Sequence, residues 1–215
     1  MVVIVDYGVG NLFSLTSSFK QIGVEVVTSG DKEIIKKADK IILPGVGAFG
    51  DAADKLFSSG LADIIIERAK SGVPVLGICL GMQLLFEKSY EYGEHKGLGL
   101  IKGEIRPIKE VIPNDYKIPH IGWNALTFGE KKSGLFKYIN EGDHVYFVHS
   151  FYGAKCSDSI IATAEYGAPL TAAVASNNVY GCQFHPEKSG NVGLNILRAF
   201  CEVNCKTGCK KEETK

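Results

Sequence analysis

Short runs of uniformly apolar residues recur in the first part of the chain, and segments of helical period separate them. The runs include VVIV at 2–5, KIILPG at 40–45 and PVLGIC at 74–79. A strand that is apolar on both faces needs cover on both faces, which is the condition inside a parallel sheet with helices above and below it. The alternation therefore predicts an α/β fold built on a mainly parallel central sheet.

The second part of the chain changes character. Short β-rich runs such as HVYFVHSFY, IIATAEY and LTAAVAS follow one another closely, which predicts added antiparallel or mixed strands that extend the same fold. A further short strand, EVVT at 25–28, belongs to the first part. Apolar residues at helical spacing predict helices over 11–22, 52–56, 61–70 and 192–203.

Composition narrows the class of protein. A chain of 215 residues fits one domain, and we expect it to span 1–203 with a flexible tail at 204–215. Lys+Arg and Asp+Glu number 24 each, so net charge gives no reason to expect nucleic acid or an anionic membrane as partner. The amino-terminal apolar run is too short for a secretory signal, and no run reaches the roughly 18 apolar residues of a membrane span. We expect a cytoplasmic protein.

Six cysteines are scattered along the chain, and without an export signal a disulfide framework is not expected. Cys201, Cys205 and Cys209 repeat every four residues near the carboxyl end. A metal site there is an alternative, but Gly208 interrupts the helix and known zinc sites use shorter C-x-x-C pairs. We therefore expect no metal.

The stretch GICLG places Cys79 between Gly77 and Gly81, where a strand predicted to end near Leu76 gives way to a helix predicted to begin near Met82. This is the G-x-nucleophile-x-G form of the strained strand-to-helix turn called a nucleophile elbow. Such a turn lifts the sulfur clear of the sheet and places it over helix N–H groups, which favour the thiolate. The alternative is a buried structural cysteine in a glycine-rich turn.

A thiolate nucleophile needs a proton acceptor, and His185 in the sequence HPE is the strongest of the five histidines. Pro186 restricts His185 to extended conformations, which puts residues i and i+2 on the same side. Glu187 can then fix the imidazole tautomer and stabilise the imidazolium. Adjacent strands of a parallel sheet bring their carboxyl ends together, so His185 can reach Cys79. Read alone, HPE could be an exposed turn.

A third stretch, PGVG at 44–47, follows the strand KIIL. Its glycines allow close approach of the backbone to a ligand and peptide orientations closed to other residues. In elbow folds, a strand-end loop beside the elbow supplies the second oxyanion donor. An ordinary glycine-containing turn is the alternative.

Together, PGVG, GICLGMQ and HPE occur in the order and at the strand ends that resemble the class I glutamine amidotransferases. Within that class, DYGVGNL at 6–12, PHIGWN at 119–124 and YFVHSFY at 146–152 are similar to the glutaminase subunits of imidazole glycerol phosphate synthase. The resemblance extends to about residue 203. It implies a flavodoxin-like three-layer sandwich, glutaminase activity and no cofactor.

The resemblance also implies roles for individual residues. Cys79 attacks the side-chain amide of glutamine, His185 moves the protons, and Glu187 holds the imidazole. The oxyanion would lie between the Leu80 N–H and an N–H of the PGVG loop. In the resembling enzymes, that loop donor is misdirected until the partner's site is filled. The loop residues implied are Gly45 and Val46, whose shared peptide suits such a flip.

Glutamine binding is expected to involve Gly47, Gln83 and the backbone of Ser150 and Phe151, with Glu91 as a weaker candidate for the substrate ammonium. Gln83 and Glu91 could instead be ordinary solvated side chains. Phe151 stands where the family usually has Tyr, a change that matters little if the contact is through the backbone.

Free ammonia is mostly ammonium at neutral pH, and the resembling enzymes avoid its release by docking on a (β/α)₈-barrel cyclase in a heterodimer. That complex makes imidazole glycerol phosphate and aminoimidazole carboxamide ribotide in histidine biosynthesis. Tyr7, Asn11, His120 and Trp123, from the two signature stretches DYGVGNL and PHIGWN, are the expected interface residues.

Three other interpretations stay open at the level of sequence. The chain could be a paralogous glutaminase that feeds a different synthase, such as one that amidates a surface sugar. It could be another hydrolase with a cysteine elbow, for example a peptidase. It could also be a degenerate binding subunit, although Cys79, His185 and Glu187 are all present.

Overall fold

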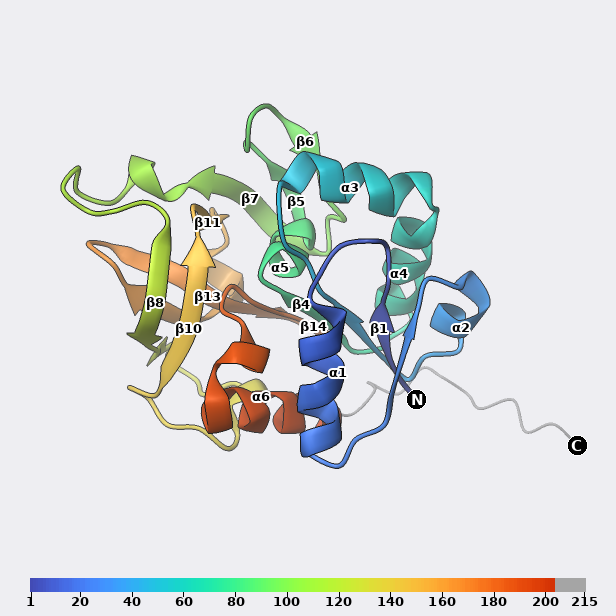
Figure 1. Cartoon of the computed structure of the whole chain (residues 1–215). Helices are drawn as coiled ribbons and strands as arrows, with labels where there is room; N and C mark the ends of the chain where they lie inside the picture. The colour runs from blue at the N-terminus through green and yellow to red at the C-terminus, as the bar shows by residue number, and fades with distance from the viewer. Residues whose placement is uncertain (204–215) are drawn as a thin grey trace, which may run out of the picture.

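The computed structural model describes residues 1–203, and a central eight-stranded sheet organises them (Figure 1). The strand order is β2-β1-β3-β4-β14-β13-β12-β9. The pairs from β2 to β14 are parallel and those from β14 to β9 are antiparallel, which confirms the predicted mixed sheet. In this order the strands span Val26–Ser29, Val2–Val5, Lys40–Leu43, Val75–Ile78, Val179–Cys182, Pro169–Ser176, Ile160–Glu165 and Thr127–Phe128.

Helices cover both faces of this sheet, as the apolar strands require. Side chains alternate along a strand, so Val3 and Val5 pack into one core and Ile4 packs into the other. Helices α2, α3 and α4 bury their apolar side chains in the first core, and α1 and α6 bury theirs in the second (Figure 1). The result is the predicted three-layer sandwich. The five helices span Leu12–Gln21 (α1), Lys32–Lys36 (α2), Phe49–Ser58 (α3), Leu61–Lys70 (α4) and Gly190–Glu202 (α6).

Helix positions follow the sequence prediction, with small differences at the ends. The helix predicted over 61–70 has those bounds, and the one predicted over 52–56 is longer at both ends. Asn11 is the N-cap of α1, since its side chain accepts a hydrogen bond from the Ser14 N–H. Helix α2 was not predicted because five residues are too few to show a period.

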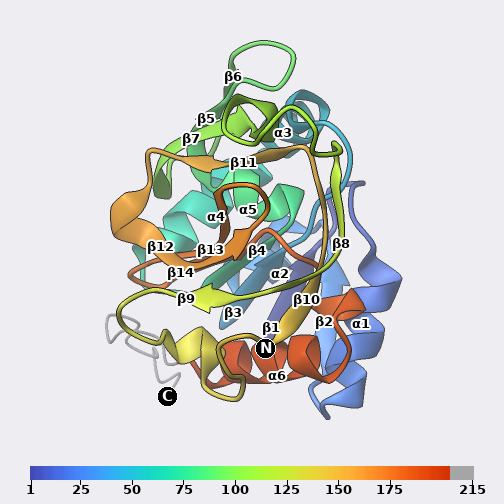
Figure 2. The same cartoon turned by 90° about the vertical axis from the view of Figure 1, so that its left-hand side faces the viewer.

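Not every strand of the second part extends the central sheet. Strands β11, β7, β5 and β6 form a separate four-stranded sheet, and β10 pairs with β8 as an antiparallel ribbon. In Figure 2, β5, β7 and β11 lie above the strands of the central sheet. These six strands span Phe151–Ala154 (β11), Ile101–Pro107 (β7), Phe86–Ser89 (β5), His95–Lys96 (β6), His144–His149 (β10) and His120–Ala125 (β8).

The turn after β4 is tighter than predicted. Strand β4 runs to Ile78 and helix α5 (Leu80–Leu84) begins at Leu80, so only Cys79 lies between them. Cys79 has φ 55° and ψ −115°, a backbone conformation that is rare and strained for a residue with a side chain. The chain therefore reverses within one residue, as expected of an elbow.

The carboxyl-terminal predictions lie partly outside the described residues. Cys205, Cys209 and the tail at 204–215 fall there, while Cys201 lies on α6 and is partly buried. Within residues 1–203, no group of three or more His, Cys, Asp or Glu side chains could hold a metal ion. No helix in the same range has the length and apolar character to cross a membrane.

Glycine is required at position 81 because the backbone of a neighbouring segment packs closely against it, and not because of its own backbone conformation. A Cβ added there would lie 1.8 Å from the Leu43 carbonyl oxygen at the end of β3. That oxygen belongs to a central strand, so it cannot move aside as the end of a flexible side chain could.

We predict that Gly81→Ala lowers the free energy of unfolding by about 3 kcal/mol or more, because the added methyl must push two packed backbone segments apart. Gly134→Ala is the matched control: a Cβ there meets nothing within 4 Å, and a change within about 0.5 kcal/mol is expected. Urea unfolding followed by circular dichroism measures both. Equal stability of the two variants would contradict the packing argument.

Candidate active site

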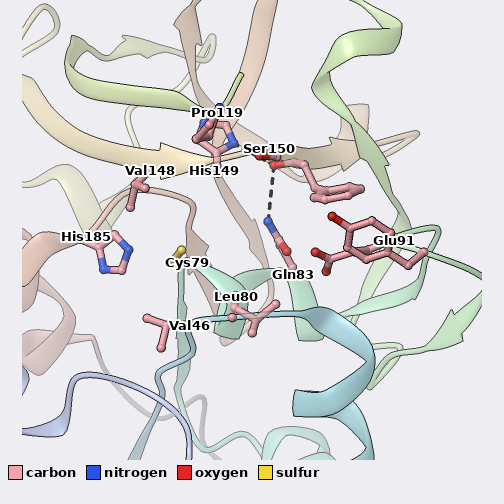
Figure 3. A pocket seen from close by; sticks show the side chains of 13 residues that line it. Val46, Cys79, Leu80, Gln83, Glu91, Pro119, Val148, His149, Ser150 and His185 are labelled. Carbon is pink, nitrogen blue, oxygen red and sulfur yellow. Dashed lines mark hydrogen bonds between the residues drawn. The ribbon is translucent and has the colours of Figure 1, made fainter. Parts of the chain in front are cut away.

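A cavity of about 330 Å³ lies beside the elbow, where PGVG, GICLG, HSF and HPE converge (Figure 3). This volume lies at the lower end of the roughly 300–1,000 Å³ typical of small-ligand sites. Most of the residues predicted from the sequence to be catalytic or to bind glutamine line it. The lining residues are Val46, Gly47, Cys79, Leu80, Gln83, Glu91, Tyr92, Pro119, Val148, His149, Ser150, Phe151 and His185.

Cys79 and His185 come together because β4 and β14 are parallel neighbours. Ile78 pairs with Cys182 at the carboxyl ends of the two strands, and the Cys79 N–H donates to the Cys182 carbonyl at 2.8 Å. His185 lies three residues beyond Cys182 and lines the same cavity as Cys79. Figure 3 shows the two side chains facing each other across the cavity.

The charge state of His185 follows from its two partners. The imidazole Nδ1 contacts the Glu187 Oε1 at 2.7 Å, and both side chains are almost fully buried. Burial lowers the pKa of His185, but hydrogen bonds to Cys79 and Glu187, together with the charges of both, outweigh burial and raise it to about 9. At neutral pH, the arrangement therefore favours the imidazolium form of His185.

Glu187 reaches His185 by a different backbone path from the one predicted. His185 is extended, as expected before proline, but Pro186–Lys188 form a 3₁₀ turn (η4) that folds Glu187 back onto the ring. Ser189 braces this turn: its hydroxyl donates to the His185 carbonyl at 2.6 Å and accepts from the Tyr146 N–H at 3.0 Å. The imidazole is thus held by backbone as well as by the carboxylate.

The PGVG loop packs directly on the elbow. A Cβ on Gly45 would lie 2.7 Å from the Gly81 nitrogen and 3.0 Å from the Tyr7 hydroxyl oxygen. That hydroxyl donates to the Pro44 carbonyl at 2.7 Å. The loop is therefore fixed at its Pro44 end, while Val46 is exposed at the cavity.

Two of the predicted interface residues are buried, which corrects their assignment as surface contacts. Tyr7 is 7% exposed and supports the PGVG loop, and burial raises the pKa of its hydroxyl. His120 is 3% exposed and stacks between the rings of Phe147 and Tyr166. In contrast, Trp123 is 55% exposed and Asn11 is exposed as well, so both stay predictions of partner contact.

The predicted glutamine-binding residues border the cavity opposite His185. Gln83 donates through Nε2 to the Phe151 carbonyl at 3.4 Å, and His149 Nδ1 contacts the same oxygen at 2.8 Å. The Ser150 carbonyl accepts from the Ile108 N–H. The Phe151 carbonyl is thus used within the protein, and a ligand there would have to rely on the other backbone groups of this segment.

Glu91 has a structural contact as well as a place in the cavity wall. Its Oε2 accepts from the Phe49 N–H at 2.6 Å, which satisfies a free donor at the start of α3. Burial raises the pKa of its carboxyl group. Glu91 therefore ties α3 to the cavity wall, and its role toward a ligand ammonium stays a prediction.

A chain of hydrogen bonds connects β8 to the cavity. Asn124 Nδ2 contacts His120 Nε2 at 3.3 Å, and His120 Nδ1 contacts His149 Nε2 at 3.0 Å. His149 Nδ1 then donates to the Phe151 carbonyl. Burial lowers the pKa of both histidines to about 4, so both are neutral at pH 7 and their tautomers are fixed by this chain.

The sequence interpretation missed two buried side chains of the site, His149 and Gln183. Gln183 lies on the segment after β14, and its Nε2 donates to the Cys79 sulfur at 3.7 Å. Its position two residues before His185 was the available signal, since alternate residues of an extended segment share a face. His149 was missed because its side-chain partner His120 lies 29 positions away in the sequence.

Comparison with known proteins identifies similar sequences along nearly the whole chain. A family model described as "Glutamine amidotransferase class-I" matches residues 3–203. A protein from Lactococcus lactis subsp. lactis named "Imidazole glycerol phosphate synthase subunit HisH" is 52% identical over 94% of this chain and 98% of its own length. A protein of the same name from Wolinella succinogenes is 49% identical over 94% of this chain and its full length.

Solved structures show the same fold at lower identity. One titled "Crystal structure of glutamine amidotransferase" has a TM-score of 0.74 at 20% identity and covers 94% of this chain and 98% of its own. One titled "Structure of PurLQS from Thermotoga maritima" has a TM-score of 0.69 at 21% identity and covers 93% and 96%.

We predict that stability falls as the pH drops from about 7 to 5, because protonation of His149 is opposed by burial in the folded state. A folded pKa of about 4 against an ordinary value near 6.5 gives stability that is complete above pH 6.5 and is lost toward pH 4. His149→Gln should reduce the loss by about 2 kcal/mol. Urea unfolding at about pH 7 and about pH 5 measures this loss of stability in the wild-type protein and in the variant.

The exposed His144 on the same strand is the control for this measurement. His144→Gln should leave the pH dependence of the wild-type protein unchanged. If His149→Gln showed the same pH dependence as His144→Gln, the buried neutral histidine would not be the cause.

Proposed function

The chain belongs to the class I glutamine amidotransferases, among the HisH subunits of imidazole glycerol phosphate synthase, and on this premise we propose how its residues carry the glutaminase reaction. The observation that carries the proposal is the meeting of Cys79 and His185 at the ends of two parallel strands, with Glu187 bonded to the imidazole Nδ1 at 2.7 Å. The chain hydrolyses glutamine to glutamate and ammonia and delivers the ammonia to a cyclase subunit.

In the first step the Cys79 thiolate attacks the side-chain amide carbon of glutamine. A carbon–sulfur bond forms and the amide oxygen takes the negative charge. The His185 imidazolium then gives its proton to the nitrogen, the carbon–nitrogen bond breaks, and ammonia leaves a γ-glutamyl thioester. Glu187 keeps Nδ1 of the ring occupied, so that Nε2 is the nitrogen that exchanges protons with the substrate.

In the second step water replaces ammonia. Neutral His185 takes a proton from the water as its oxygen attacks the thioester carbon. Collapse of the second tetrahedral intermediate breaks the carbon–sulfur bond, releases glutamate and restores the thiolate–imidazolium pair. The same imidazole thus acts as acid in the first step and as base in the second.

Two backbone donors would stabilise the oxyanion. Leu80 is the first residue of α5, and the N–H groups of a first helical turn have no acceptor within the helix. Val46 offers the second N–H from the PGVG loop, which contacts the elbow through Gly45. Each such donor typically contributes about 10²–10³ in rate.

Glutamine would lie between the sulfur and the far wall of the cavity. Gly47, Gln83 and the Ser150–Phe151 backbone border this space, together with the Glu91 carboxylate, whose negative charge suits an α-ammonium group. The exposed Tyr92 closes the rim by edge contact with the Phe151 ring, at 6.4 Å between centroids.

The partner we propose is a (β/α)₈-barrel cyclase subunit in a heterodimer that makes imidazole glycerol phosphate and aminoimidazole carboxamide ribotide. Large exposed apolar side chains support a docking face: Ile121 and Trp123 on β8, and Phe13, which is 83% exposed, at the start of α1. The Tyr146 ring lies beside Trp123, and the Lys188 ammonium lies over the Tyr146 ring, 5.7 Å from its centroid. We place the complex in the cytoplasm, where thiols stay reduced.

The names of the relatives favour this partner over the synthase of a surface-sugar paralogue, since both relatives described above are subunits of imidazole glycerol phosphate synthase. A peptidase with a cysteine elbow would need neither a partner nor an exposed apolar face beside its site.

We predict that Cys79→Ala abolishes glutamine-dependent synthesis by the complex and leaves synthesis from added ammonium salts intact. The variant removes the nucleophile without touching the cyclase. Product formation with glutamine and with ammonium chloride, measured in parallel, tests this. Residual glutaminase turnover within tenfold of the wild-type protein would refute the assignment of Cys79 as nucleophile.

We also predict that the isolated chain hydrolyses glutamine slowly and that a barrel subunit with its nucleotide ligand accelerates it, because the loop donor at Val46 is completed only in the complex. Trp123→Ala should raise the concentration of barrel subunit needed for half-maximal acceleration by about tenfold or more, as expected of an aromatic interface anchor.

Tyr138→Ala is the control for this titration. Tyr138 is also an exposed aromatic, but it contacts Glu202 near the end of α6, and the following Val203 carbonyl is bonded by Lys40 at the amino end of β3. This end of the sheet is opposite the cavity. We therefore expect Tyr138→Ala to leave the concentration of barrel subunit needed for half-maximal acceleration unchanged. Fast turnover by the isolated chain would count against a gated oxyanion donor.

A further inference from the structure

A fully buried amide lies between the nucleophile and the glutamine-binding wall. Gln183 has no exposed surface, its Nε2 lies 3.7 Å from the Cys79 sulfur, and its Oε1 accepts from Gln83 Nε2 at 2.9 Å. Burial of an amide is costly unless its donors and acceptors are used. Here both ends are used, and both contacts are with residues of the site.

The network fixes which way the amides point. Gln83 Nε2 donates both to Gln183 Oε1 and to the Phe151 carbonyl, which uses both of its N–H groups. Since Oε1 of Gln183 faces Gln83, its amide nitrogen must face the sulfur. The oxygen of Gln83 is then the atom left to meet a ligand.

We propose that Gln183 is a positioning residue for the glutaminase reaction: its amide N–H donates to the Cys79 sulfur, and its carbonyl holds Gln83 so that the Gln83 oxygen faces the substrate. This inference rests on the proposed function. It assigns one buried side chain to two tasks, namely stabilising the sulfur anion and presenting an acceptor for the α-ammonium group of glutamine.

The first task follows from the charge on sulfur. A hydrogen bond donated to an ionised group favours that group's charged form. The titratable groups that face the sulfur are His185, backed by Glu187, Tyr7 from the loop after β1, and Cys182 on β14. Gln183 differs from all of these because it has a fixed dipole and no titration of its own. It acts on the sulfur both before attack and when the thiolate is released from the thioester.

The second task follows from the shared contact with Gln83. Without an acceptor at Gln183, one Gln83 N–H loses its partner and the amide is free to turn. The Gln83 oxygen would then no longer be held toward the cavity, and glutamine binding would weaken. A single change at Gln183 should therefore alter both the nucleophile and the affinity for glutamine.

The test measures the rate of alkylation of Cys79 by iodoacetamide as a function of pH in the absence of glutamine, with the Cys79 peptide identified by mass spectrometry. Gln183→Met keeps the volume and removes the donor, and we expect the alkylation midpoint to rise by about one pH unit. Gln183→Glu keeps the acceptor and puts an oxygen near the sulfur, and the rise should be larger.

Gln83→Met separates the two tasks by degree. It removes the proposed acceptor for the substrate but leaves the Gln183 amide nitrogen in place beside the sulfur. It should therefore raise the KM for glutamine and move the alkylation midpoint less than Gln183→Met does. Circular dichroism shows whether each variant folds. If Gln183→Met does not fold, the alkylation midpoint of the near-isosteric Gln183→Glu tests the proposal instead. Unchanged midpoints in folded Gln183 variants would overturn the proposal.

This outcome is distinct from failure of the proposed function. If the wild-type complex did not hydrolyse glutamine while the alkylation midpoints shifted as expected, the glutaminase assignment would fail and the contact of Gln183 with the sulfur would stand. A glutamine-hydrolysing complex with unshifted midpoints would give the reverse result.

Discussion

The parallel pairing of β4 with β14 is the contact on which the site depends. Residues more than a hundred positions apart become neighbours because two strand ends share one edge of the sheet, with Ile78 opposite Cys182. The elbow turns at the next residue, and the strained backbone of Cys79 is tolerated because Gly77 and Gly81 leave room for the chain to reverse. Weakening this pairing would separate the thiol from His185 even if every side chain of the site were intact.

Local patterns in the sequence were sufficient to predict the central layers and to select the residues that we propose take part in the reaction. Apolar runs and helical spacing predicted the parallel sheet and its two helical layers, and the glycine pattern around Cys79 predicted the elbow. The extended backbone of His185 followed from the restriction that proline imposes on its neighbour, whereas Glu187 contacts the ring through a 3₁₀ turn that the sequence did not predict. These features are local, since each depends on residues that are adjacent or a few positions apart.

What the sequence could not supply was long-range pairing. The separate four-stranded sheet and the β8–β10 ribbon depend on which strands meet, and short apolar runs carry no record of their partners. The same reason explains the buried positions of Tyr7 and His120, which looked like surface residues in exposed motifs. Both make contacts with distant segments, through the Pro44 carbonyl and the His149 ring.

The close contact between Gly45 and Gly81 has a consequence for protein engineering. The loop after β3 and the elbow after β4 touch backbone to backbone, so they behave as one interlocked part. An elbow transplanted into another parallel sheet would arrive without the loop N–H that we propose as the second oxyanion donor, unless the terminal turn of the adjacent strand were grafted with it. The smallest portable unit of this chemistry is therefore two neighbouring strand ends together with the strand that carries the histidine.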